Sequence, residues 1–317
     1  MRRRTFALSS VFVLLGAFLA TIVGDAPRAV AASSGAPRVT LISAGASPRS
    51  PLRLAITQGD ATSASMEFSQ SIEQSLDGTP TNSIDLPPTI FLLHVTADSV
   101  ASNGDAQISF SYADIEVVDD GSLGTAERAQ LEAAYAPLES VTGTGRLTAR
   151  NQVFNSELAG TEGFDPVVEQ TMSQVSDQVG SVSVPFPTEA VGTGARWRGV
   201  SSARVSGIDV QQTYEYTLRE READRVVLDV EYTQTAPRQR AELPGIPDGA
   251  KVEITKFRMT GTGTTTLGLS DLLPTESTMH ASGVQVLSIR DQGERGTLRQ
   301  KLTLDATVSP PPGEGPA

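Results

Sequence analysis

Apolar and polar residues alternate with a period of two along much of the chain. The clearest case is a pair of runs, 208–218 and 226–232, joined by the charged segment REREADR. Alternation of this kind is typical of strands with one buried face, so we expect an antiparallel hairpin with its other face in water. The expected buried face carries Ile208, Val210, Gln212, Tyr214, Tyr216, Leu218, Val226, Leu228, Val230 and Tyr232.

The same pattern occurs earlier in the chain. Met66, Phe68, Gln70 and Ile72 alternate with polar residues, residues 89–97 are nearly all apolar, and alternation returns at 108–112 after Asn103-Gly104. An Asn-Gly step favours a tight turn because both residues readily adopt a positive φ angle. The sequence therefore predicts a second hairpin around residue 104.

Some predicted strands change parity partway. Val252 and Ile254 share one parity, whereas Phe257 and Met259 share the other, and the run 108–112 gives way to Ile115 and Val117. A β-bulge or a strong bend changes parity in this way, and we expect it to let one long strand serve two surfaces. Long, bent antiparallel strands favour a curled sheet over a flat one.

Helical patterns are few. Residues 166–179 follow Asp165, which is a suitable N-cap, and Gly180 supplies the stop. A second helix is expected at 125–136, where Leu131 and Tyr135 are spaced for one helical face. The fold class is therefore mainly β (α+β), with two helices laid on long, bent antiparallel strands.

The chain also contains an internal similarity. VTGTGRLT begins at Val141 and MTGTGTTT at Met259, 118 residues later, each in a Thr-rich predicted strand. The offset predicts two similar β-rich halves, 50–180 and 181–308, which could each curl into a half-barrel. Glycines inside such strands permit close backbone approach or a sharp bend.

Both ends of the chain differ from the predicted strands. Residues 1–31 combine three arginines, an apolar stretch and a final Ala-Val-Ala, which is typical of a secretory signal peptide; the alternative is an uncleaved anchor. Residues 32–49 are expected to be disordered or extended, and the Pro/Gly-rich tail 309–317 to be disordered. We therefore predict a secreted or cell-envelope protein with no stable membrane span after cleavage, exported by the general or the twin-arginine route.

Composition narrows the range of partners. The chain has no cysteine, so neither a disulfide framework nor a lipoprotein anchor is expected. Without residues 1–31 it has 21 basic and 36 acidic residues, a net charge of −15. Nucleic acid binding needs basic patches that release counterions, so nucleic acid is not an expected partner.

The segment PFPTEAVGTGARWRG (185–199) contains the single tryptophan of the chain, Trp197, behind Gly192 and Gly194. A phosphate-binding loop needs a helix start after its glycines, and no helical pattern follows here. We interpret Gly192-Thr193-Gly194 as a turn that leads into a strand. Trp197 is then expected to be a core residue, with contact to a ligand as its alternative role.

The sequence contains no recognised catalytic or metal motif. His94 lies in an apolar run and is expected to be a buried, neutral, hydrogen-bonded imidazole, and His280 is the only other histidine. Two histidines without cysteine do not favour a transition-metal site, and no serine-hydrolase or zinc-protease motif occurs. We predict no catalytic residues, no metal and no cofactor.

The segment PFPTEAVGTGARW, the strand QQTYEYTLRE and the signal peptide without a lipidation cysteine resemble those of uncharacterised secreted β-rich proteins of high-GC bacteria. The resemblance covers the central part of the chain. It implies a shared β-rich fold, and it transfers neither a function nor a functional residue.

Two hypotheses of function follow. Curled strands could enclose an apolar cavity for a lipid or another hydrophobic small molecule, with Tyr214, Tyr216 and Trp197 as the candidate ligand-binding residues. Alternatively, the same apolar faces only pack on each other, and the protein is a structural or interaction module whose partner is an envelope protein. A secreted hydrolase is the second alternative, because catalytic carboxylates pair in space and leave no motif.

Overall fold

The fold was analysed in a computed structural model, which describes residues 37–159, 183–205, 208–241, 250–291 and 293–312. The predicted signal peptide, 1–31, and the predicted helix at 166–179 lie outside the described residues. The other prediction of a helix is confirmed, because helix α1 spans Thr125–Tyr135 and a 3₁₀ helix follows at Ala136–Ser140. The Glu127 carboxylate accepts a hydrogen bond from the Gly124 N–H at 2.9 Å, and this contact fixes the start of α1.

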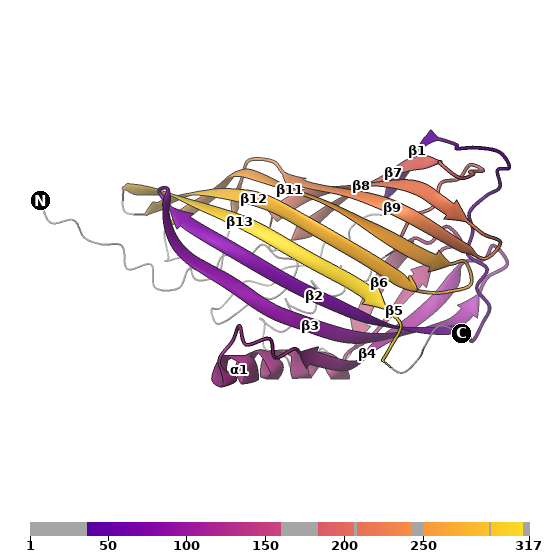
Figure 1. Ribbon diagram of the computed structural model, residues 1–317, viewed down its shortest axis with the longest axis horizontal. Coiled ribbons are helices and arrows are strands. Elements are labelled where there is room, and N and C mark those ends of the chain that lie inside the picture. Colours follow the sequence, from indigo (N-terminus) through magenta and orange to yellow (C-terminus); the bar gives the residue numbers. More distant parts are fainter. Residues whose placement is uncertain (1–36, 160–182, 206–207, 242–249, 292, 313–317) are drawn as a thin grey trace, which may run out of the picture.

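The described strands form one large antiparallel sheet (Figure 1), in agreement with the predicted mainly β fold. The order across the sheet is β1-β7-β8-β9-β11-β12-β13-β2-β3-β4-β5-β6, and the short β10 pairs with β11. The strands are β1 (Arg38–Ser43), β2 (Ala61–Leu76), β3 (Thr79–Val100), β4 (Ala106–Val117), β5 (Thr142–Leu147), β6 (Val153–Ala159), β7 (Arg196–Val205), β8 (Ile208–Arg221), β9 (Arg225–Ala236), β10 (Gln239–Ala241), β11 (Lys251–Gly268), β12 (Glu276–Asp291) and β13 (Glu294–Ser309).

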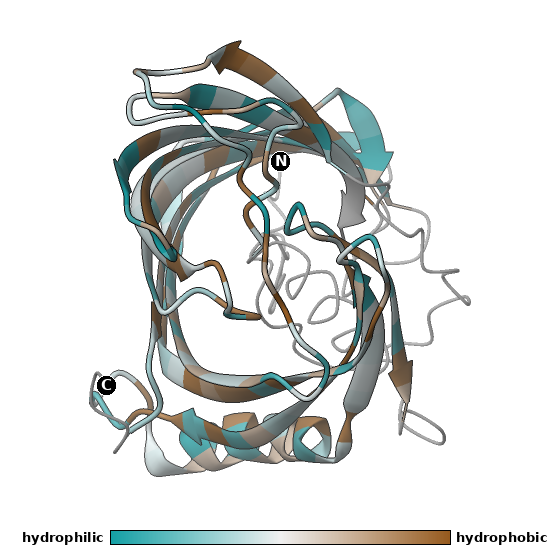
Figure 2. Cartoon of the chain, turned by 90° about the vertical axis from the view of Figure 1, so that its right-hand side faces the viewer, coloured by the Kyte–Doolittle hydropathy of each residue, from teal (hydrophilic) through white to brown (hydrophobic). Residues whose placement is uncertain are grey.

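The sheet is curled, and it joins the two predicted halves of the chain. Figure 2 looks along the curl and shows the strands curving around, with α1 along the lower side. Strand β13 pairs with β2, and β1 pairs with β7, so both ends of the described chain cross into the other half. The strands therefore form one continuous curled sheet whose described edges are β1 and β6, in place of two separate half-barrels.

Both predicted hairpins are present. Strands β8 and β9 pair antiparallel, as do β3 and β4, and Gly104 adopts a φ of 83° in the turn between the latter two. The side-chain oxygen of Asn103 accepts a hydrogen bond from the Asp105 N–H at 3.2 Å and closes this turn. The Asn-Gly signal therefore identified the turn correctly.

The predicted parity changes occur at bulges, but their consequence differs from the prediction. The register between β11 and β12 shifts between Ile254 and Lys256, and after the shift Phe257 and Met259 lie in the same buried cluster as Val252 and Ile254. Strand β4 has the same kind of bulge, with one extra residue between Tyr112 and Asp114 relative to its partner strand β3. A bulge adds one residue and so cancels the change of parity, which keeps the apolar side chains on one surface instead of two.

The two surfaces of the sheet differ in charge. Cross-strand register places the apolar and aromatic side chains of β8, β9, β11, β12, β13 and β2 on the inner face of the curl. Between the hairpin ends, the charged side chains of these strands occupy the alternate positions and point to the outer face. The outer face is therefore the face in contact with water. These outward residues are Asp209, Glu215, Asp229, Glu231, Glu253, Lys256, Arg258, Arg299, Lys301, Asp305, Glu67 and Glu73.

The prediction of a buried His94 is wrong. His94 shares the parity of Ile90 and Leu92 as expected, but that parity belongs to the outer face, and the imidazole is exposed with its Nδ1 hydrogen-bonded to the Ser63 hydroxyl. The inner positions of this stretch are Phe91, Leu93 and Val95. In a run that is apolar on both parities, composition does not reveal which parity faces inward.

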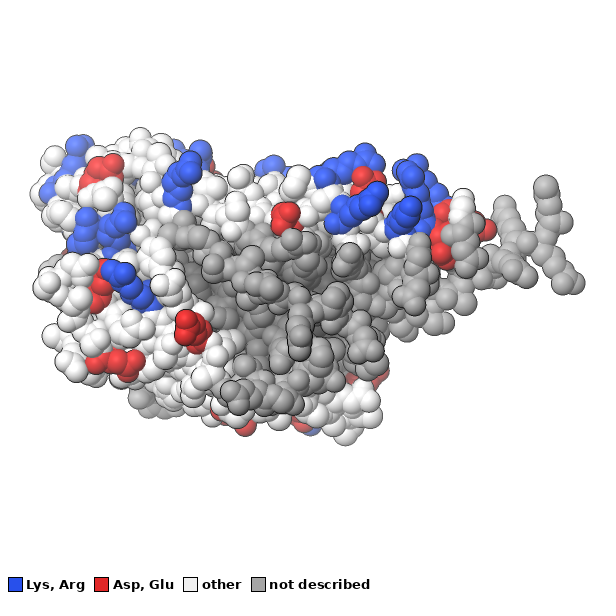
Figure 3. All heavy atoms as spheres, turned by 180° about the vertical axis from the view of Figure 1, so that it is seen from behind, with Lys and Arg blue, Asp and Glu red and all other residues white. Residues whose placement is uncertain are grey.

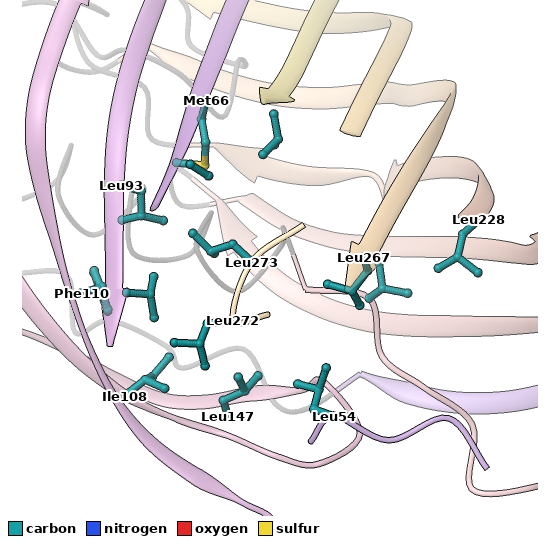
Figure 4. Close-up of a cluster of buried hydrophobic side chains, with 14 of the residues drawn as sticks. Leu54, Met66, Leu93, Ile108, Phe110, Leu147, Leu228, Leu267, Leu272 and Leu273 are labelled. Atoms are coloured by element: carbon teal, nitrogen blue, oxygen red, sulfur yellow. The ribbon is translucent and has the colours of Figure 1, made fainter. Parts of the chain in front are cut away.

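One end of the curl is filled by side chains (Figure 4). Leu54 from the segment before β2, and Leu272 and Leu273 from the turn after β11, are buried in one cluster with residues of β4 and β5. This packing closes the end at which β2 begins and β3 ends.

The glycines of the two TGTG segments allow close packing, as the sequence predicted. A Cβ atom on Gly143 would lie 2.1 Å from the Phe110 ring, and one on Gly263 would lie 1.9 Å from the Thr278 carbonyl oxygen. Both segments pair with the long strand that precedes them in the sheet, β5 with β4 and β11 with β9. The duplication of the two halves stays a prediction.

Candidate ligand-binding face

The segment 185–199 is a turn followed by a strand, as the sequence predicted. The N–H groups of Gly192, Gly194 and Ala195 donate to the carbonyl oxygens of Ala44, Leu218 and Gly192, at 3.0, 2.7 and 2.9 Å. The backbone therefore uses these amides itself, and they are not turned toward an anion as in a phosphate-binding loop.

Trp197 is a core residue. Its side chain is fully buried, and its indole N–H donates to the Pro185 carbonyl oxygen at 2.9 Å. The indole stacks on Tyr216, with 5.6 Å between the ring centroids. The hydrogen bond satisfies the one polar group of the indole, so Trp197 holds the 185–199 segment against β8.

The three candidate ligand-binding residues belong to one row of aromatic rings on the inner face. The ring of Tyr216 lies 6.1 Å from that of Tyr214, which lies 4.8 Å from that of Tyr232. Trp197 and Tyr216 are buried, whereas Tyr214 and Tyr232 are only partly buried. Tyr214 and Tyr232 are therefore the members of the row that a ligand can reach without displacing the core.

Small residues continue the inner face beyond the tyrosines. Tyr214 pairs across the strands with Gly199 on one side and Tyr232 on the other, and Tyr232 pairs with Gly261. Next to these lie partly exposed inner residues of four strands, so an accessible apolar surface extends from β8 to β2. It comprises Tyr214, Tyr232, Gly261, Gly263, Met279, Gly283, Leu304, Ala306 and Phe68, and we call it the inner apolar surface.

The environment of the tyrosines is apolar. Burial raises the pKa of Tyr214 to about 12. Burial also holds the pKa values of Tyr216 and Tyr232 well above the usual value, with the proximity of Tyr214 as the second cause for both. Burial also raises the pKa values of the other two tyrosines, Tyr112 and Tyr135. A phenolate is therefore disfavoured at all five positions, because burial against apolar groups penalises the charged form.

Alkaline titration tests this environment. An unfolded chain loses its phenolic protons near pH 10, whereas the folded protein keeps them to about pH 12 or above. The stability tied to these protons is complete below about pH 10 and falls as the pH rises from there through about 12. Phenolate absorbance should thus appear late and together with loss of the circular dichroism signal of the sheet. A gradual titration near pH 10 with the sheet intact would contradict the assigned burial.

Glutamine side chains interrupt the inner apolar face. Gln74, Gln300 and Gln285 lie directly opposite one another on β2, β13 and β12, and all three are buried. On β2, Gln70 lies two residues from the apolar Phe68 and Ile72, and its side chain is also buried. Gln70 and Gln212 lie on the predicted apolar parity of their strands, where no role was predicted for them. A glutamine in such a position is the signal in the sequence for a polar side chain on the inner face.

Gln285 is the most unusual of these glutamines. Its side chain is 0% exposed, and neither its amide oxygen nor its amide nitrogen has a hydrogen-bond partner among the described residues. The amide oxygen of Gln70 also lacks one. Leaving a buried polar group unpaired costs about 1–3 kcal/mol, so a leucine at position 285 would be the more stable choice for packing alone.

A small pocket lies next to Gln70. Phe68, Leu86, Phe91, Tyr135 and Leu304 line it together with Gln70, and its volume of about 10 Å³ is room for about one water molecule. A pocket of this size does not hold a lipid. A ligand would instead lie on the inner apolar surface.

The charged residues form pairs on the outside of the sheet. Figure 3 shows Lys and Arg side chains gathered along the upper margin of the rear view. Arg198 and Arg196 both contact the Glu215 carboxylate, at 2.6 and 3.3 Å, and Arg238 contacts Glu253 at 2.6 Å. Exposed pairs of this kind add little stability.

Within the described ranges, no group of three or more His, Cys, Asp or Glu side chains is arranged to hold a metal ion. None of the helices in the same ranges has the length and apolarity needed to span a membrane.

Comparison with known proteins identifies no family. No family model and no curated protein sequence matches the chain. Among solved structures, OccK2 (OpdF) and OpdQ of Pseudomonas aeruginosa align over 80% and 79% of this chain and 98% and 97% of theirs, each at 8% identity, with TM-scores of 0.16 and 0.19. The CymD monoaromatic hydrocarbon channel aligns over 80% of this chain and 89% of its own, at 8% identity and a TM-score of 0.14. TM-scores this low give no argument for a shared fold or function.

Proposed function

We propose that this protein is an exported, non-enzymatic binding protein that holds a hydrophobic small molecule or lipid against the inner face of its curled sheet. The observation that carries the proposal is the inner apolar surface, whose residues are neighbours across several strands and are only partly buried. The exported location is part of the proposal and rests on the signal-like sequence of residues 1–31.

The charge distribution supports an uncharged or apolar ligand. Between the hairpin ends, the charged side chains of the six central strands point outward, so the described residues of the inner face there offer nothing to neutralise an ionic group. Tyr214 offers a large apolar ring together with a hydroxyl group, which suits the boundary between an apolar chain and water.

Substitution of Tyr214 tests the proposal. With a fluorescent diacylglycerol as the probe, we expect saturable binding to the wild type and a Kd raised about fivefold or more by Tyr214→Ala, because a large ring is lost from the contact surface. The melting temperature should fall only moderately, since Tyr214 is partly exposed. Tyr216→Ala removes a buried ring stacked on Trp197 and should act mainly on stability.

Thr213→Ala is the matched control. Thr213 neighbours Tyr214 on β8 but has the opposite parity and therefore faces outward, so this variant should bind the probe as the wild type does. If the folded wild type does not bind the probe, the proposal fails. The structural or interaction module is then the better hypothesis, with the edge strand β1 and its exposed Ile42 as the first surface to test.

A further inference from the structure

A row of amide side chains crosses the inner face of the sheet. Gln285 on β12 lies opposite Gln300 on β13, which lies opposite Gln74 on β2, and Asn82 on β3 follows. Phe257 on β11 lies on the other side of Gln285. We call Gln285, Gln300 and Gln74 the glutamine row.

Within the glutamine row, Gln285 has hydrogen-bonding capacity that the described part of the protein does not use. The Gln285 amide is fully buried and has a donor group and an acceptor group without a partner there. Its neighbours along β12, Gly283 and Leu287, bring no polar side chain to it, and Gln300 lies directly opposite but forms no hydrogen bond with the Gln285 amide. Buried polar groups are nearly always paired, so this amide points to a partner that is not a side chain of the described protein.

We propose that the glutamine row recognises an uncharged, hydrogen-bonding headgroup, such as a hydroxyl or an amide, on the hydrophobic ligand. This inference rests on the proposed function, because the ligand's apolar part would lie on the inner apolar surface. A primary amide both donates and accepts, so it matches a hydroxyl or amide group. A carboxylate or phosphate would be buried without a counter-charge, because the described inward residues of the central strands between the hairpin ends carry none.

The spacing along the sheet fits a ligand with two parts. Gln285 is four residues along β12 from Ala281, which lies in the cross-strand row of Tyr214, Tyr232 and Gly261. At about 3.3 Å per residue, the glutamine row lies about 13 Å from the tyrosines. Met259, Gly283 and Leu302 occupy the intervening row, so an extended alkyl chain would lie on apolar groups throughout.

Three probes with one fluorescent alkyl chain and different ends test the inference. They are a pyrene-labelled decane, the matching decanol and the matching decanoate, the last at pH 8, where the carboxylate is ionised. We expect the wild type to bind the alcohol about tenfold more tightly than the hydrocarbon or the carboxylate. Gln285→Leu should lower the affinity for the alcohol to that for the hydrocarbon, leave hydrocarbon binding unchanged and keep or raise the melting temperature.

Gln211→Leu is the control, because Gln211 is an exposed glutamine on the outward parity of β8. It should keep the preference for the alcohol. Equal binding of the alcohol and the hydrocarbon by the wild type, or an unchanged preference in Gln285→Leu, would overturn the headgroup inference and leave the proposed function intact. Failure of all three probes to bind would overturn the proposed function itself. The wild-type comparison needs no substitution, so it decides the question even if Gln285→Leu does not fold.

Discussion

Replacing Trp197 with alanine is expected to lower the free energy of unfolding by about 3–5 kcal/mol, the largest effect of any single truncation proposed for this protein. The indole is fully buried, stacks on Tyr216 and donates its N–H to Pro185. Its removal leaves a large hole between β7, β8 and the segment that precedes β7, and it leaves the Pro185 carbonyl oxygen without this donor. Urea denaturation of the purified protein measures the change.

Two variants separate the parts of this effect. Trp197→Phe keeps an aromatic ring but loses the hydrogen bond, so it should cost less than Trp197→Ala, with about 1–3 kcal/mol from the unpaired carbonyl group. Ile42→Ala removes a side chain that is 46% exposed and should change stability by no more than about 0.5 kcal/mol. If Trp197→Ala unfolds at the same urea concentration as Ile42→Ala, Trp197 is not a core residue.

Gly192→Ala is expected to lower the free energy of unfolding by about 3 kcal/mol through a steric clash with the backbone. A Cβ atom at this position would lie 1.9 Å from the Ala46 carbonyl oxygen and 2.7 Å from that of Pro48. Neither oxygen belongs to a side chain that could rotate away, so the two segments would have to separate. Thermal unfolding followed by circular dichroism gives the effect.

Gly194→Ala is the matched variant, two residues away. Gly194 has a φ of +80° but nothing within 4 Å of an added Cβ, so the substitution should cost only the strain of a left-handed conformation, about 1 kcal/mol. Equal effects of the two substitutions would show that close packing is not the reason for the glycine at 192. Loss of an anion ligand in either variant with stability unchanged would restore the phosphate-binding interpretation.

Both large effects act at the junction between the N-terminal segment and the second half of the chain. Ala46 donates its N–H to the Thr193 carbonyl oxygen at 2.8 Å, and Ser50 and Val191 form a backbone bridge. The Arg221 guanidinium donates to the carbonyl oxygens of Ser50 and Val191, at 2.8 and 2.7 Å. These contacts hold the segment before Leu52 and Leu54, which fill the closed end of the curl, so a weakened junction should also disturb that end.

The sequence by itself determined the local structure of this protein. Alternation of apolar and polar residues identified long strands such as β8 and β9, Asn103-Gly104 identified a turn, and the spacing of Leu131 and Tyr135 identified α1. These features depend on neighbouring residues, because a strand repeats every two residues and a tight turn spans only a few. The same alternation also placed Tyr214 and Tyr216 on one face before any partner strand was known.

Only the tertiary structure decided which strands are neighbours and which of their faces is inward. His94 has the parity expected from the sequence, yet that parity faces water. Gln74 and Gln300 are 226 residues apart in the chain, and they face each other only because β13 pairs with β2 in one register. A shift of one residue would turn each glutamine to the outer face, and the curl and the long-range packing fix the register, so no local pattern could predict the glutamine row.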